Sequence, residues 1–143
     1  MKPFISIFAT ILLITSLNSC NKDDDTKLAA CDNKVVVSAS EYLNAPADHL
    51  TINSIEIIGD CLVIDFGSSG CDGSTWELKL IDEDVILESY PPQKNLRLSL
   101  KNVEVCDAYF VKEISFDISL LQVGGDKVLL NIKGFDKQFL YEY

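Results

Sequence analysis

Residues 96–101 read Leu96-Arg97-Leu98-Ser99-Leu100-Lys101, and apolar and polar side chains alternate strictly through all six positions. Successive side chains of a β-strand point to opposite faces, so this stretch predicts a strand with one apolar and one polar face. The same period of two recurs at Leu62, Ile64 and Phe66 on one side of this stretch and at Ile114, Phe116 and Ile118 on the other. Gly59-Asp60 and Gly124-Gly125-Asp126 are turn signals between such runs.

Seven to eight runs of this kind follow one another, and no window keeps a helical period. A helical turn fits only at residues 40–44, ahead of Pro46. Short strands with regularly spaced turn signals are typical of all-β sandwiches and barrels. We therefore expect an all-β fold, an antiparallel β-sandwich with an immunoglobulin-like Greek key in preference to a closed barrel. The 143 residues suit one compact domain.

The first 20 residues have a different character. Lys2 is followed by an apolar run from Phe4 to Leu17, which is too short for a transmembrane helix and suits a signal peptide. The run ends in Leu17-Asn18-Ser19-Cys20, which resembles the lipobox of bacterial lipoproteins. This resemblance implies that residues 1–19 are removed and that Cys20 carries a diacylglycerol and an N-acyl chain such as palmitate. Stable anchoring takes at least two hydrocarbon signals, which these chains would supply.

Lys22, Asp23, Asp24 and Asp25 follow the lipid-acceptor cysteine directly. A Lys followed by acidic residues at this place resembles the surface-export signal of lipoproteins from the Bacteroidota, and the whole chain resembles small uncharacterised lipoproteins of that group. The resemblance implies a lipid anchor in the outer membrane and display at the cell surface. We expect residues 20–30 to form a flexible acidic tether and residues 31–143 to form the sandwich domain.

Four cysteines remain after Cys20 is lipidated, and an even number in an exported chain predicts two disulfides. A strand starting at Cys61 would carry Cys71 about 20 Å away, too far for a bridge. Two pairings remain open: Cys31 with Cys61 and Cys71 with Cys106, which we prefer, or Cys31 with Cys71 and Cys61 with Cys106. No Cys-x-x-Cys knuckle occurs, so we expect no zinc site, no other metal and no cofactor.

Charge excludes one class of partner. The chain carries 22 Asp and Glu against 12 Lys and Arg, for a net charge of −10, and removing residues 1–19 takes away Lys2 and makes it −11. Phosphate binding needs clustered basic residues, so we expect no nucleic-acid partner. The chain has a single histidine, His49, and no nucleophile elbow around Ser68 or Ser69, which argues against a hydrolase of the serine type.

The most unusual segment is Gly67 to Trp76, a loop of small polar residues that leads to the only tryptophan. As a binding site, it would use Trp76 as a stacking platform and Asp72, Ser74 and Thr75 as polar anchors. As structure, Trp76 is in phase with Leu78 and Leu80 and would face the core, and we favour this interpretation. We interpret Asp82-Glu83-Asp84 as a solvated turn, because calcium needs a defined spacing of oxygen ligands that is absent here.

These observations predict a non-enzymatic, surface-exposed lipoprotein that acts as a binding or accessory module, with a protein or glycan partner. One alternative is an inhibitor of a host or competitor hydrolase such as lysozyme, since an acidic domain attracts a basic enzyme. The second alternative is a small hydrolase that depends on carboxylates. With 22 acidic residues on one small domain, close carboxylate pairs are expected by chance, so this pattern alone indicates little.

Overall fold

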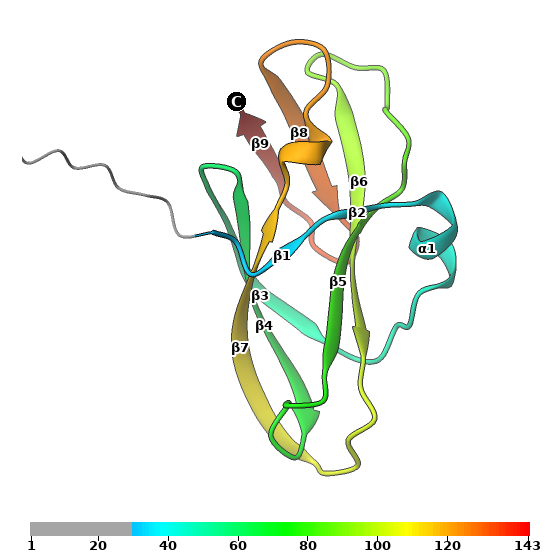
Figure 1. Cartoon of the computed structure of the whole chain (residues 1–143), viewed down its shortest axis with the longest axis vertical. Coiled ribbons are helices and arrows are strands. Elements are labelled where there is room, and N and C mark those ends of the chain that lie inside the picture. Colours follow the sequence, from blue (N-terminus) through cyan, green and yellow to red (C-terminus); the bar gives the residue numbers. More distant parts are fainter. Residues whose placement is uncertain (1–29) are drawn as a thin grey trace, which may run out of the picture.

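A computed structural model gives the structure of the protein, and it describes residues 30–143. The predicted signal peptide at 1–19, the predicted lipid-acceptor Cys20, the predicted export tag at 22–25 and all of the predicted tether except Ala30 lie outside the described residues. Two β-sheets face each other across an apolar core, and the molecule is elongated along the strands (Figure 1). The expected all-β sandwich is confirmed.

Each sheet draws strands from distant parts of the chain. The four-stranded sheet has the order β1 (Asn33–Lys34), β7 (Ala108–Asp117), β4 (Cys61–Gly70) and β3 (Thr51–Ile58). The five-stranded sheet has the order β2 (Val36–Val37), β5 (Glu77–Asp82), β6 (Gln93–Lys101), β8 (Lys127–Ile132) and β9 (Gln138–Glu142). A helix, α1 (Ala39–Asn44), and a 3-10 helix, η1 (Ser119–Leu121), complete the described elements.

The pairs β3–β4, β4–β7, β5–β6 and β8–β9 are antiparallel, as expected for this sandwich. The structure adds three parallel pairs, β1–β7, β2–β5 and β6–β8. Nine strands stand in place of seven or eight, because the first predicted strand divides at the buried Val35. This N-terminal segment passes from one sheet to the other and pairs with both, so it closes one side of the sandwich.

The alternating apolar residues form the core. Gly59 takes a φ of 58° in the β3–β4 hairpin turn, a conformation that favours glycine. From this turn the strand β4 sends every second side chain inward. The largest fully buried apolar side chains are Tyr141, Phe66, Phe116, Leu62, Ile64, Leu80, Ile81, Leu96, Leu100, Ile118, Leu121 and Leu130. Each large apolar side chain that is removed from water stabilises the fold by about 1.5–3 kcal/mol.

The polar face of β6 is covered rather than solvated. Helix α1 begins after Ser38, whose hydroxyl accepts a hydrogen bond from the Glu41 N–H, and the chain that follows the helix lies over β6. The Arg97 guanidinium donates to the carbonyl oxygens of Tyr42 and Ala45, both at 2.6 Å. Arg97 is therefore buried, although alternation alone places it on the polar face of an amphipathic strand.

Both disulfides follow the preferred pairing. Cys31–Cys61 ties the N-terminal segment to the start of β4, and Cys71–Cys106 ties the β4–β5 loop to the β6–β7 loop. Their sequence separations are 30 and 35 residues. Crosslinks over such spans stabilise a fold by about 3–4 kcal/mol each, chiefly by restricting the unfolded chain. Within residues 30–143, no helix is long and apolar enough to cross a membrane.

Candidate functional site

The predicted ligand loop is wrapped around a carboxylate of the chain itself. Glu104 lies between β6 and β7, and its Oε2 accepts hydrogen bonds from the N–H groups of Cys71 at 2.6 Å and Gly73 at 3.0 Å. The Asp72 N–H donates to the same oxygen at 3.2 Å. Thr75 donates to Oε1 through its N–H at 3.3 Å and through its hydroxyl at 2.9 Å. Successive backbone N–H groups that converge on one anion form a nest, which Glu104 fills.

These contacts set the charge of Glu104. Burial acts to raise the pKa of this carboxyl, but the N–H groups of Gly73 and Cys71, together with Thr75, outweigh it and lower the pKa from 4.5 to about 2. Hydrogen bonds to the ionised form stabilise that form. Glu104 is therefore an anion at neutral pH, and the N–H groups of the nest are already used.

Asp72 and Ser74 are hydrogen-bonded to each other within the loop. The Ser74 N–H donates to Asp72 Oδ1 at 2.8 Å, an Asx turn, and hydrogen bonds from Ser74 lower the pKa of Asp72. Gly73 has a φ of +68°, and a Cβ there would lie 2.6 Å from Lys112 Nζ. Ligand binding by Asp72, Ser74 and Thr75 stays a prediction, but their contacts favour a structural role.

Trp76 braces this loop against the core. Its ring lies 6.0 Å from the Phe66 ring, and the Lys112 ammonium lies 5.1 Å from its centroid, within cation–π range. Lys112 Nζ also donates to the Gly73 carbonyl at 2.8 Å. The indole Nε1 is buried and has no hydrogen-bond partner among residues 30–143. These contacts favour the core interpretation of Trp76 over a stacking platform.

The candidate hydrolytic groups are not assembled with one another. The Ser68 hydroxyl donates to the backbone carbonyl of His49 at 2.7 Å, so the imidazole is not its partner. Ser69 is exposed on the neighbouring position of β4. Within the described part of the chain, no group of three or more His, Cys, Asp or Glu side chains is placed to hold a metal ion.

Two open hollows of about 310 and 290 Å³ flank the Cys31–Cys61 disulfide. Asp60 and Asp117 line the first. Hydrogen bonds from Ser119 lower the pKa of Asp117, whereas a general acid needs a raised one. Asp60 accepts a hydrogen bond from the Tyr141 hydroxyl at 2.5 Å, and burial with this bond raises the pKa of Tyr141 to about 12. The Ser119 hydrogen bonds therefore favour the ionised form of Asp117, and Asp60 is already the acceptor of the Tyr141 hydroxyl.

Sequence reasoning missed a buried ion pair. Lys94 Nζ lies 2.6 Å from Asp82 Oδ2, and the two side chains are 8% and 0% exposed. The interpretation of Asp82 as part of a solvated turn is therefore wrong. The sequence did contain a signal for this pair. Asp82 lies two residues after Leu80 and Lys94 lies two residues before Leu96, so each charged side chain is on the same strand face as an inward-facing leucine.

The segment between these two charges, which we call the 83–92 loop, is tied down at its base. The Glu83 N–H donates to the Asn95 carbonyl at 3.0 Å, and the Asn95 amide donates to Glu83 Oε2 at 2.8 Å. Leu87 and Gln93 exchange two backbone hydrogen bonds, at 2.9 and 3.1 Å. Gln93 Oε1 in turn accepts from Asn131 at 3.1 Å, which links the loop to β8.

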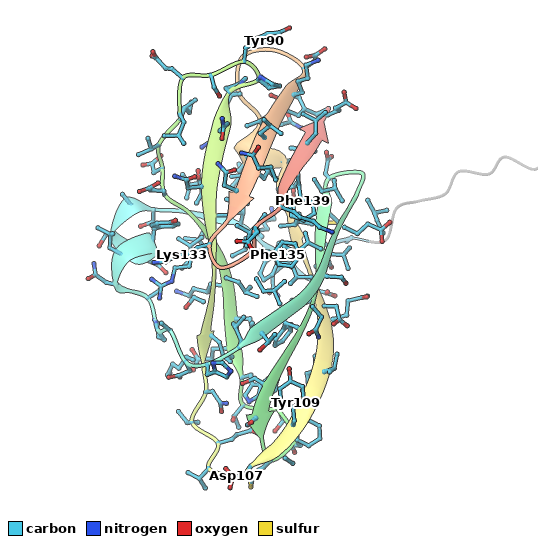
Figure 2. All side chains as sticks on the ribbon, turned by 180° about the vertical axis from the view of Figure 1, so that it is seen from behind. Tyr90, Asp107, Tyr109, Lys133, Phe135 and Phe139 are labelled. Atoms are coloured by element: carbon cyan, nitrogen blue, oxygen red, sulfur yellow. A yellow bond between two sulfur atoms is a disulfide. The ribbon has the colours of Figure 1, made fainter. Side chains whose placement is uncertain are left out.

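This ordered loop exposes large apolar side chains. Tyr90 is 93% exposed and Ile86 is 51% exposed, and Val85 and Leu87 are exposed beside them. Figure 2 shows Tyr90 at one end of the long axis and Asp107 at the other. Tyr109, near Asp107, is also exposed, but its phenol end fills the space above Gly67, where a Cβ would lie 2.0 Å from its hydroxyl. The β6–β7 loop, which contains Asp107, also exposes Val103 and Val105. The 83–92 loop combines its exposed apolar side chains with the exposed carboxylates of Asp84 and Glu88, and for this reason it is the candidate functional site.

Comparison with known proteins identifies the fold and no function. No protein-family model matches the chain, and no curated protein matches it. A solved structure of a protein of unknown function (DUF1344) from Bacteroides vulgatus ATCC 8482 is similar, with a TM-score of 0.51 and 17% identity over 78% of this chain and 56% of that one. A putative toxin-related protein from Parabacteroides distasonis ATCC 8503 has a TM-score of 0.46 and 17% identity, over 78% and 59% of the two chains.

Proposed function

We propose that this chain is a non-enzymatic binding module, anchored in the outer membrane through lipid at Cys20 and displayed at the cell surface. The observation that carries the proposal is the 83–92 loop, which is hydrogen-bonded at its base and still exposes Val85, Ile86, Leu87 and Tyr90. Single exposed apolar residues are common on proteins, but a contiguous group indicates an interaction site. A loop that is ordered before binding loses little conformational freedom on binding.

Lipidation and display have their own test. Cells that express the full chain would be treated with an added protease, and the lipid on Cys20 would be followed by metabolic labelling with a fatty-acid analogue. Replacing Lys22, Asp23, Asp24 and Asp25 with Ala should leave the protein lipidated but protected from the protease. Unchanged cleavage of this variant would discard the export proposal, and absence of label on the native chain would discard the anchor.

Binding is tested by recovery of a partner. The lipidated protein would be crosslinked in native membranes and purified, and the co-purifying material identified by mass spectrometry. We expect one partner in about stoichiometric amount, recovered with the native chain and not with a matched lipoprotein in which an unrelated domain replaces residues 31–143. Recovery of the same proteins with both baits, or of none with the native chain, would contradict the proposed binding function.

A further inference from the structure

The 83–92 loop combines two chemical characters. Its apolar side chains lie between acidic ones: Glu83 and Asp84 precede Val85, and Glu88 separates Leu87 from Tyr90. No Lys or Arg occurs from Asp82 to Gln93. The nearest cation in sequence, Lys94, is buried and paired with Asp82, so it does not offset the exposed acids.

We infer that the 83–92 loop is the contact surface of the module and that its partner is a protein with an apolar pocket rimmed by Lys and Arg. This inference rests on the proposed binding function. Tyr90 is the central anchor, because an exposed tyrosine offers a large apolar ring and a hydroxyl, and tyrosines are frequent among the residues that dominate binding energy.

Charge selects the class of partner. Asp84 and Glu88 are exposed beside the apolar side chains, and the whole chain carries a net charge of −10. Such a field attracts a basic protein surface and raises the rate of encounter. It repels anionic lipid headgroups, so the apolar loop is unsuited to docking on an anionic membrane.

The base of the loop supplies rigidity for this contact. The Asp82–Lys94 ion pair and the two Leu87–Gln93 backbone hydrogen bonds fix both stems on β5 and β6. Ser89 is held as well, because its hydroxyl accepts a hydrogen bond from the Gln93 amide at 3.0 Å. Tyr90 is thus presented by a loop whose order does not depend on a partner.

The test is site-specific photocrosslinking of the full chain in native cells. A photoreactive phenylalanine analogue would replace Tyr90, and in a matched control it would replace Val105 in the β6–β7 loop, since both side chains are 93% exposed. We expect a discrete protein adduct from position 90 and none from position 105, with Lys- or Arg-rich segments flanking the crosslinked peptide. An adduct with lipid, or equal adducts from both positions, would overturn the inference.

Charge is tested by reversal. Glu88→Lys should lower recovery of the partner about tenfold, because it places a cation against the basic rim. Glu113→Lys is the control. Glu113 is exposed on β7, and this substitution changes the net charge by the same amount at a place away from the loop. Raising the salt concentration should weaken partner binding by the native chain and should have little effect on partner binding by the Glu88→Lys variant.

The outcomes separate the inference from the function on which it rests. A partner recovered equally by the native chain, a Tyr90→Ser variant and Glu88→Lys would overturn this contact surface and leave the binding function in place. No partner with any bait would contradict the binding function itself. A partner lost with Tyr90→Ser but insensitive to Glu88→Lys and to salt would overturn the basic rim.

Discussion

The β4–β5 loop and the 83–92 loop lie at opposite ends of the sandwich (Figure 1), and both are ordered by hydrogen bonds to a neighbouring segment. They differ in whether their aromatic side chain is packed or exposed. The first loop packs Trp76 against Phe66 and under Lys112, whereas the second leaves Tyr90 almost fully exposed. Order in a loop therefore does not by itself distinguish a structural segment from a binding surface.

What distinguishes them is where their polar groups point. In the β4–β5 loop, the N–H groups converge on Glu104, so the groups that an outside ligand would need are used internally. In the 83–92 loop, the hydrogen bonds lie at the base, through Leu87, Gln93 and Asn95, and the tip is left for contact. Four variants test this comparison.

The largest effect is expected at the base of the 83–92 loop. Lys94→Ala would leave Asp82 as a buried charge without its partner, and breaking such a pair typically costs about 3–5 kcal/mol. Urea denaturation would measure the loss in the free energy of unfolding. Lys101→Ala is the control on the same strand, because its ion pair with Glu77 is exposed and should be worth less than about 1 kcal/mol. Equal effects from the two variants would contradict the importance of the buried pair.

The next effect concerns the disulfide of the β4–β5 loop. Replacing Cys71 and Cys106 with Ser should lower the free energy of unfolding by about 3–4 kcal/mol, since the unfolded chain regains the freedom of a 35-residue span. Amide hydrogen exchange should accelerate at residues 71–75 and stay unchanged at residues 83–92. Acceleration at both ends would show that the two loops are not independent.

A smaller effect is expected from Glu104→Gln, which removes the anion from the nest. The native pKa of about 2 lies below the usual 4.5, so this group stabilises the fold fully above the usual value and loses that contribution as the pH falls toward 2. The melting temperature of the variant should therefore lie below that of the native protein at pH 7, and the difference should shrink between about pH 4.5 and pH 2. As a control, Asp107→Asn in the β6–β7 loop, which also contains Glu104, should leave the melting temperature unchanged. A difference that is independent of pH would contradict the role of the ionised carboxylate.

The smallest effect on stability is expected from Tyr90→Ser. Tyr90 is 93% exposed, so its removal should change the free energy of unfolding by less than about 0.5 kcal/mol. The same substitution should abolish most recovery of the partner. Denaturation and pull-down of one preparation would measure both quantities, and a large loss of stability would show that Tyr90 belongs to the fold rather than to the contact surface.

Much of the fold was predictable because alternation is a local property. The period of two placed Leu62, Ile64 and Phe66 on one face, and a strand of fixed direction made a Cys61–Cys71 bridge impossible. The 83–92 loop was not predicted as a site, since its apolar residues show no regular period. The role of Glu104 could not be predicted either, because Glu104 lies about 30 residues along the sequence from the N–H groups that donate hydrogen bonds to it.

The sequence by itself determined that the chain is all-β, which apolar side chains of the alternating runs face the core, and that its four domain cysteines form two bridges. Tertiary structure alone decided that β1 and β2 pair with different sheets, that Arg97 is buried beneath the segment that follows α1, and that Asp82 meets Lys94. The physical reason is that strand periodicity and turn chemistry act between neighbours in sequence. Burial of a charge and exposure of Tyr90 depend instead on which distant segments the fold brings together.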